Sequence, residues 1–197
     1  MEKSNLELTE QELISKFGND PNSSWMFAVV DKYKPMSQED IKADMVKNQL
    51  PLGILMAHTN GDFNISSVIR SCNGFNLKEF HYFGKKKIDR RGCVGSHRYI
   101  DVKFHSDFQE IKDLKAQYHF VALENNVVRA PVNLVDYIWR RDKPSLIVVG
   151  EESCGLTAEV LELCDDFVEI PMFGAARSFN VSVAASICMY DFVSKNK

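Results

Sequence analysis

The stretch SLIVVGEESCGLTAEVLELCDDFVEIPM, residues 145–172, contains the pattern that decides the fold. The apolar run SLIVVG predicts a buried strand, TAEVLELC (157–164) predicts a helix, and DFVEIPM (166–172) predicts a second strand. Two strands separated by a helix are typical of a parallel pair, because a parallel pair needs a long crossover between its strands.

The same alternation continues through most of the chain. Further strands are predicted at 52–59, 79–84, 102–104 and 118–124, and helices at 64–75, 107–117, 134–141 and from Ser178 onward. This order predicts an α/β fold, with a mostly parallel sheet and helices on both of its faces. The first 49 residues differ, since the capping box TEQE (9–12) and the polar cap at Ser37 predict two short helices. We therefore expect a helical N-terminal extension, residues 1–49, followed by one domain, residues 50–197.

The composition limits the class of protein. Of 197 residues, 45% are hydrophobic and 26% are charged, which is ordinary for a soluble globular domain. No apolar run approaches the ~20 residues of a membrane helix, and the acidic N-terminus lacks the apolar core of a signal peptide. Five cysteines lack C-x-x-C spacing, and no His, Cys and carboxylate cluster has metal-ligand spacing. We expect a cytoplasmic protein that binds no metal.

The distribution of charge is more informative than the net charge of −3. The segment KKKIDRRGCVGSHR, residues 85–98, contains six Lys or Arg residues and one Asp, a local charge of +5. Such a basic loop in a mildly acidic protein is typical of phosphate contacts, although a solvated charged loop would look the same. The candidate nucleic-acid contacts are Lys85, Lys86, Lys87, Arg90, Arg91 and Arg98.

The loops that follow the predicted strands carry the unusual polar residues. In open parallel sheets these loops meet at one edge, where ligands bind. Gly150 would let a ligand approach the backbone, whereas Glu151 and Glu152 would repel phosphate, and no Walker lysine is present. Ile170, Met172 and Phe179 would add an apolar wall. The residues alone therefore predict a site for a nucleoside-like ligand without phosphates.

Two polar residues suggest helix caps. Asn64 stands where an N-cap of its helix belongs, and Ser178 is a natural N-cap of the last helix. Asn180, in the expected first turn, would then have no capping role and would be available to the site. Ser66, Arg70 and Asn73 are expected to form a polar stripe.

Three segments carry a specific resemblance: NISSVIR (64–70), IVVGEESCGL (147–156) and IPMFGAARSFNVSVAASI (170–187). In this order and spacing they resemble the three motifs of the SpoU/TrmH family of RNA 2′-O-ribose methyltransferases. The resemblance covers about residues 50–195. It implies a SPOUT fold with a C-terminal trefoil knot, a homodimer, and metal-free methylation of a ribose 2′-hydroxyl in structured RNA, with tRNA favoured over rRNA. The implied cofactor is S-adenosyl-L-methionine.

The resemblance also implies roles for individual residues. Leu123, Gly150, Ile170, Met172 and Phe179 would line the cofactor pocket. Arg70 resembles the family's catalytic arginine, and the remaining polar motif positions are Asn64, Glu152, Ser178 and Asn180. Arg177 would contact RNA or a partner subunit. Because arginine stays protonated, Arg70 could act as a base, as a donor that orients the hydroxyl, or as a phosphate anchor.

Two departures and two alternatives accompany this interpretation. Phe179 stands where leucine is commoner, and Glu151 where Ser or Asn is frequent. The chain could be a non-catalytic, dimeric RNA-binding module that retains the fold, although its intact polar motifs argue against this. It could also bind another adenosine compound, with the basic loop merely solvated. RNA binding that weakens steeply with salt would argue against this last alternative.

Overall fold

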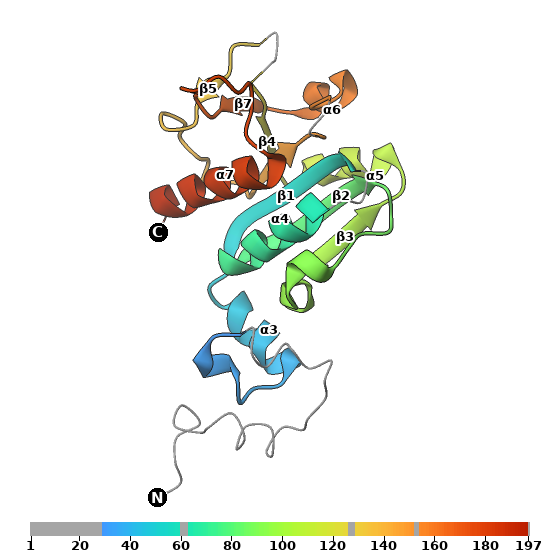
Figure 1. Ribbon diagram of the computed structural model, residues 1–197, viewed down its shortest axis with the longest axis vertical. Coiled ribbons are helices and arrows are strands. Elements are labelled where there is room, and N and C mark those ends of the chain that lie inside the picture. The colour runs from blue at the N-terminus through green and yellow to red at the C-terminus, as the bar shows by residue number, and fades with distance from the viewer. Residues whose placement is uncertain (1–28, 60–62, 126–128, 152–153, 197) are drawn as a thin grey trace, which may run out of the picture.

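A computed structural model describes residues 29–59, 63–125, 129–151 and 154–196 (Figure 1). Its centre is a seven-stranded sheet in the order β3-β2-β1-β6-β4-β7-β5, and every neighbouring pair is parallel. The strands are β1 (Leu50–Thr59), β2 (Leu77–Gly84), β3 (Asp101–His105), β4 (His119–Leu123), β5 (Val132–Asn133), β6 (Ser145–Val149) and β7 (Asp166–Glu169). The predicted parallel α/β sheet is confirmed.

Helices cover both faces of this sheet. The α-helices are α3 (Gln38–Val46), α4 (Phe63–Gly74), α5 (Phe108–Asp113), α6 (Ala158–Leu163) and α7 (Val181–Asn196). Short 3-10 turns are η2 (Asp31–Tyr33), η3 (Arg91–Cys93), η4 (Ser96–Arg98) and η5 (Leu114–Ala116). Among the described residues, no helix combines the length and apolar character needed to cross a membrane.

The alternation of side chains along each strand divides the core into two layers. In β1, Ile54 packs in the layer formed with α4 and α7, whereas Leu55 packs in the layer formed with α5 and α6. In β6, Ile147 packs in the layer with α4 and α7, and Val148 packs in the layer with α5 and α6. Because strands buried on both faces need apolar residues at consecutive positions, these runs lack the polar alternation of a half-exposed sheet.

The prediction for the segment 134–141 is wrong, because the predicted helix does not form. The chain continues from β5 through a turn into extended backbone. Tyr137 and Trp139 alternate inward, with the Tyr137 hydroxyl donating to Asp166 (2.7 Å) and Trp139 Nε1 donating to Asp191 (2.8 Å). Ile138 between them is exposed. These tertiary contacts outweigh helix propensity, which is a weak preference.

Lys195 near the end of α7 fixes the same segment. Its Nζ donates to the carbonyl oxygens of Leu134 (2.7 Å), Val135 (2.9 Å) and Tyr137 (3.1 Å). These are main-chain acceptors that a helix would have used internally. The extended segment is therefore held by α7, about 60 residues later in the chain.

Both predicted caps at the motif helices are wrong. The last helix begins at Val181, and Asn180 caps it: Asn180 Oδ1 accepts from the Ser182 backbone N–H at 3.0 Å. Ser178 lies outside the helix. α4 begins at Phe63, so Asn64 lies in the first turn. Ser66 is buried and donates to the Phe63 carbonyl, so it does not belong to a polar stripe.

The N-terminal region is partly described. Ser37 caps α3 as predicted, since its Oγ accepts from the Asp40 backbone N–H at 3.1 Å. Asn76 Nδ2 donates to the Met45 carbonyl at 2.9 Å, which ties α3 to the chain beyond α4. The predicted cap at residues 9–12 lies outside the described residues. The division at residue 49 stays a prediction, as does the trefoil knot.

Candidate cofactor and RNA site

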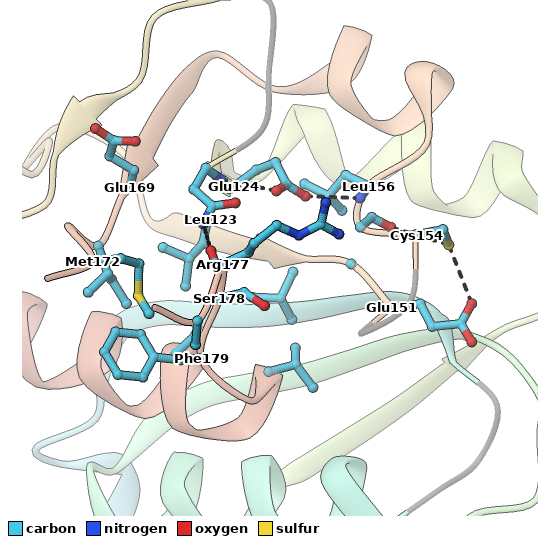
Figure 2. Close-up of a pocket in the computed structure, with 18 of the residues that line it drawn as sticks. Leu123, Glu124, Glu151, Cys154, Leu156, Glu169, Met172, Arg177, Ser178 and Phe179 are labelled. Atoms are coloured by element: carbon cyan, nitrogen blue, oxygen red, sulfur yellow. Dashed lines mark hydrogen bonds between the residues drawn. The ribbon is translucent and has the colours of Figure 1, made fainter. Parts of the chain in front are cut away.

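A cavity of about 710 Å³ lies beyond the carboxyl ends of β4, β6 and β7 (Figure 2). Parallel strands bring these ends to one edge of the sheet, as the sequence predicted. Its lining comes from residues 123–125, 149–151, 154–156, 161, 169–172, 176–179, 181 and 184. All five predicted cofactor residues are in it: Leu123, Gly150, Ile170, Met172 and Phe179. The volume is within the usual range for small-molecule sites, about 300–1,000 Å³.

The loop after β6 turns back on itself. The backbone N–H of Glu151 donates to the Gly155 carbonyl (3.3 Å), and the N–H of Gly155 donates to the Glu151 carbonyl (2.8 Å). A Cβ on Gly150 would lie 2.2 Å from the Gly155 carbonyl carbon, and Gly155 has φ +69°. Gly150 is therefore required by contact within the loop, a different reason from the ligand approach that the sequence suggested.

The charges around the cavity select the kind of ligand. Glu124, Glu151 and Glu169 belong to the lining, against one cationic side chain among the described lining residues, Arg177. This excess of carboxylates disfavours a polyphosphate and favours a cationic group. S-adenosylmethionine fits this requirement, since it has a sulfonium charge and no phosphate. Leu123, Ile170 and Phe179 add apolar side chains to the lining.

Two polar motif residues meet beside the cavity. Asn180 Nδ2 donates to Asn64 Oδ1 at 2.9 Å, joining the third motif to the first across 116 residues of sequence. Ser178 lines the cavity itself. Arg70 is exposed on α4, six residues after Asn64, and is not among the lining residues. Glu152 lies outside the described residues.

The basic loop forms the connection between β2 and β3. Lys85, Lys86, Lys87, Arg90 and Arg91 are exposed and Arg98 is half-buried. The Arg91 guanidinium donates to Asp89, with Nη2 and Oδ2 2.6 Å apart, and this bond lowers the pKa of Asp89 to about 2. Arg91 is thus already partly neutralised, whereas the other side chains carry the positive surface.

The basic loop is packed against the motif helix α4. Its Gly92 is buried, and a Cβ there would lie 2.2 Å from Ser66 Oγ. Arg177 does not join the loop: its side chain extends across the cavity toward the segment that carries Leu156 (Figure 2). The predicted RNA contacts therefore divide between the loop and the cavity.

Two residues of the cavity received no role from the sequence. Glu124 Oε2 accepts from the Leu156 backbone N–H at 3.2 Å, and Asn125 Nδ2 donates to the Arg177 carbonyl at 2.7 Å (Figure 2). Glu124 is the last residue of the predicted strand 118–124, and Asn125 follows it. The sequence carried no sign of their partners, because these lie about 30 and 50 residues further along the chain. In the part of the chain that the structure describes, no group of three His, Cys, Asp or Glu could hold a metal ion.

Comparison with known proteins agrees with the fold and the cavity. The family model described as the SpoU rRNA Methylase family matches residues 51–190. A tRNA (guanosine(18)-2′-O)-methyltransferase of Aquifex aeolicus is 31% identical over 151 residues, 74% of this chain and 70% of that protein. The crystal structure of the A. aeolicus TrmH/SpoU tRNA modifying enzyme superposes with a TM-score of 0.69 at 26% identity, covering 80% of this chain and 81% of the other.

A third relative bears on the cofactor. The SpoU methyltransferase AviRb from Streptomyces viridochromogenes, in complex with the cofactor AdoMet, superposes with a TM-score of 0.64 at 25% identity. The alignment covers 73% of this chain and 57% of AviRb.

The parallel sheet, with a carboxylate-rich cavity at the carboxyl ends of its strands, is the architecture of an α/β protein that can hold a nucleoside-type cofactor. The chain belongs to the SpoU rRNA Methylase family. It is accordingly an RNA 2′-O-ribose methyltransferase with S-adenosylmethionine as methyl donor, as the three motifs implied.

Proposed function

We propose that this protein methylates a ribose 2′-hydroxyl of tRNA, with guanosine 18 as the first position to test. The main structural support for this proposal is the Asn180–Asn64 hydrogen bond, which joins two motifs beside the cavity. Further support comes from relatives named as tRNA (guanosine(18)-2′-O)-methyltransferases. The exposed basic loop supplies positive charge for a polyanionic substrate.

The cofactor supplies an electrophilic methyl group, and the protein would hold this group and the ribose 2′-hydroxyl in place for the reaction. In-line transfer depends on holding the two reactants close and aligned. We assign cofactor contacts to Leu123, Gly150, Ile170, Met172 and Phe179. Ser178, at the cavity wall, would face the reacting ribose.

The remaining motif residues would prepare the acceptor. Asn64 and Asn180 hold the starts of α4 and α7 together, and Glu152 is proposed to orient the loop after β6. Arg70 would contact the ribose or its adjacent phosphate from the exposed surface of α4. An arginine is a weak general base, so we assign it the role of a donor that orients the hydroxyl or neutralises the phosphate.

RNA contacts are proposed for Lys85, Lys86, Lys87, Arg90, Arg91, Arg98 and Arg177. The first six lie on the β2–β3 connection, packed on the helix that carries Arg70. A tRNA held there would lie near that helix. Binding through several phosphates should weaken steeply as salt is raised.

We also propose a homodimer formed through α4 and α7. A groove of about 410 Å³ lies between these helices, lined by Ser67, Ser71, Ser182, Val183, Ser186, Ile187 and Tyr190. No charged side chain is among these described residues, and Val183 and Tyr190 are 46% and 63% exposed. Depletion of charge around exposed apolar and tyrosine side chains is typical of the core of an interface. The groove begins next to Asn180, so a second copy would border the site.

Residues 1–49 are proposed as an extension to a methyltransferase domain of residues 50–197, in the cytoplasm. All five cysteines are free, which suits a reducing compartment.

The test is transfer of labelled methyl groups to an unmodified tRNA transcript, followed by nucleoside mass spectrometry. A matched transcript with 2′-deoxyguanosine at position 18 removes the acceptor oxygen. We expect 2′-O-methylguanosine from the first transcript and none from the second. Equal incorporation into both would move the target to another nucleotide, and no incorporation into any tRNA would overturn the tRNA proposal.

Arg70→Ala tests the proposed role of the arginine. We expect transfer to fall by roughly 10²–10³-fold, the range for the loss of one donor that stabilises charge in the transition state, with the cofactor dissociation constant unchanged. Arg141→Ala is the matched control, an exposed arginine outside the basic loop. Normal turnover by the Arg70 variant would contradict the assignment.

A further inference from the structure

The cavity is built from segments that are far apart in the sequence. One side comes from the loop after β6, through Gly150 to Leu156, and another from the segment after β7, through Ile170 to Phe179. A cofactor held between them requires the correct spacing of these two segments. Loops ordered before binding reduce the entropy that binding must overcome.

Glu124 and Asn125, directly after β4, contact both segments. Glu124 Oε2 accepts from the Leu156 backbone N–H (3.2 Å), and Asn125 Nδ2 donates to the Arg177 carbonyl (2.7 Å). The two residues are also joined to each other, because Glu124 Oε1 accepts from the Asn125 backbone N–H at 3.0 Å. The backbone N–H of Glu124 donates to the Val168 carbonyl of β7 at 3.0 Å, which fixes the pair to the sheet.

The fit between Glu124 and the loop after β6 is close. A Cβ on Gly155 would lie 2.4 Å from Glu124 Oε2, so the carboxylate occupies the space that a side chain at 155 would need. Gly155 also has φ +69°, a conformation that favours glycine. The carboxylate and the turn therefore determine each other's position.

Asn125 contacts the segment after β7 at a main-chain group, the Arg177 carbonyl. The Arg177 carbonyl precedes Ser178 and Phe179 of the cavity wall, and Asn180, which caps α7. Fixing this carbonyl orients the segment between the end of β7 and the start of α7. Figure 2 shows this bond and the Glu124–Leu156 bond on the same side of the cavity.

We propose that Glu124 and Asn125 are positioning residues that set the spacing of the two cavity loops and thereby the affinity for S-adenosylmethionine. This inference rests on the proposed function of the cavity. The pair acts through backbone groups of Leu156 and Arg177, so its effect on cofactor affinity can be measured without RNA.

Asn125→Asp is the sharpest variant, because it keeps the size of the side chain and removes the donor to the Arg177 carbonyl. We expect the dissociation constant for S-adenosylmethionine, measured by calorimetry without RNA, to rise about tenfold, or 1.4 kcal/mol. The KM for the cofactor should rise in parallel. Amide hydrogen exchange of residues 174–179 in the cofactor-free protein should become faster.

Matched variants separate positioning from a general structural effect. Asn48→Asp makes the same change at an exposed turn after α3 and should leave affinity and exchange as in the wild type. Glu124→Gln keeps one carbonyl acceptor and should retain more affinity than Glu124→Ala. Tm values within about 2 °C of the wild type would exclude partial unfolding as the cause.

The outcomes distinguish this proposal from the proposed function. If the wild type binds S-adenosylmethionine and Asn125→Asp binds it equally well, the positioning role is wrong and the cavity assignment stands. If Asn125→Asp and Asn48→Asp lose affinity alike, the positioning role is also wrong. If the wild type does not bind S-adenosylmethionine, both proposals fail.

Discussion

At the residue scale, single side chains in this protein serve the fold and the site together. Asn180 caps α7 through its Oδ1 and contacts Asn64 through its Nδ2. Glu124 accepts a hydrogen bond from a backbone N–H of the loop after β6, and it also lines the cavity. Both side chains suit this double use, because the Asn180 amide has a donor and an acceptor and the Glu124 carboxylate has two acceptor oxygens.

Substitution at Asn180 should separate its two roles. Asn180→Ala loses the cap and should lower the free energy of unfolding by about 1 kcal/mol. Asn180→Asp keeps an acceptor for the Ser182 N–H at a helix N-terminus, where a carboxylate is favourable, and should stay within about 0.5 kcal/mol of the wild type. Both variants lose the donor to Asn64, so both should lose methyl transfer.

Denaturant unfolding and transfer assays on the same preparations make this test. Full transfer by Asn180→Asp would show that the Asn180–Asn64 bond is dispensable. Equal stability of the Ala variant and the wild type would show that the cap contributes little.

At the scale of elements, neighbouring strands bury a chain of titratable groups. His81 of β2 is fully buried, its Nδ1 lies 2.9 Å from His105 Nε2 of β3, and His105 Nδ1 lies 3.2 Å from Glu110 of α5. Glu79 Oε2 lies 2.9 Å from His81 Nε2 and 2.8 Å from Lys103 Nζ. Tyr118 packs edge-on against His81. Burial lowers the pKa of His81 to about 4.

This shift predicts a loss of stability in acid. Between about pH 6.5 and 4 the unfolded chain binds a proton at His81 that the folded protein does not bind, so the free energy of unfolding falls as the pH falls. The full effect is about 3 kcal/mol, at 1.36 kcal/mol per pKa unit. Urea unfolding from pH 7 to 4.5 measures most of it, and near pH 4.5 carboxylates whose pKa the fold lowers add to the fall.

The variant His81→Asn keeps a polar group near the position of Nδ1 and removes the titration. Its free energy of unfolding should be lower at pH 7 but should depend less on pH between 7 and 4.5. An unchanged pH slope would assign the acid sensitivity to other groups. Glu79 adds to this fall near pH 4.5, because its pKa is lowered overall: burial raises it, but Lys103, His81 and Lys78 together outweigh burial.

At the scale of the whole molecule, the groove between α4 and α7 predicts the oligomeric state. Ile187→Glu places a charge in this groove and should convert a dimer into a monomer, because an unpaired charge in an interface core is costly. Ile138→Glu is the control, since Ile138 is 86% exposed and lies outside the groove. Sedimentation velocity at several concentrations gives the mass.

A wild type that sediments as a monomer would contradict the proposed dimer. A dimeric Ile187→Glu variant would place the interface on another surface. Loss of the dimer by the Ile138 variant alone would identify the segment 132–138 as the interface.

The sequence by itself determined the layers, the parallel sheet, the edge at which ligands bind and all five predicted residues of the cavity wall. The layers, the sheet and its ligand edge follow from local patterns of apolar runs, helix periodicity and turn residues, whereas the set of five cavity residues followed from the resemblance of the three motifs. The order and spacing of the three motifs also indicated the reaction. In-line methyl transfer depends on holding the two reactants in place, and the residues that can do this stand at the ends of parallel strands.

Only the tertiary structure decided the rest. It replaced a predicted helix at 134–141 with an extended segment, because Asp166, Asp191 and Lys195 supply hydrogen bonds from distant parts of the chain. It moved the cap of α7 from Ser178 to Asn180 and gave Glu124 and Asn125 their partners. The hydrogen bonds of the 134–141 segment, Glu124 and Asn125 join residues far apart in the sequence, which a local pattern cannot predict. The cap of α7 required a choice between two nearby polar residues, and a local pattern fits both.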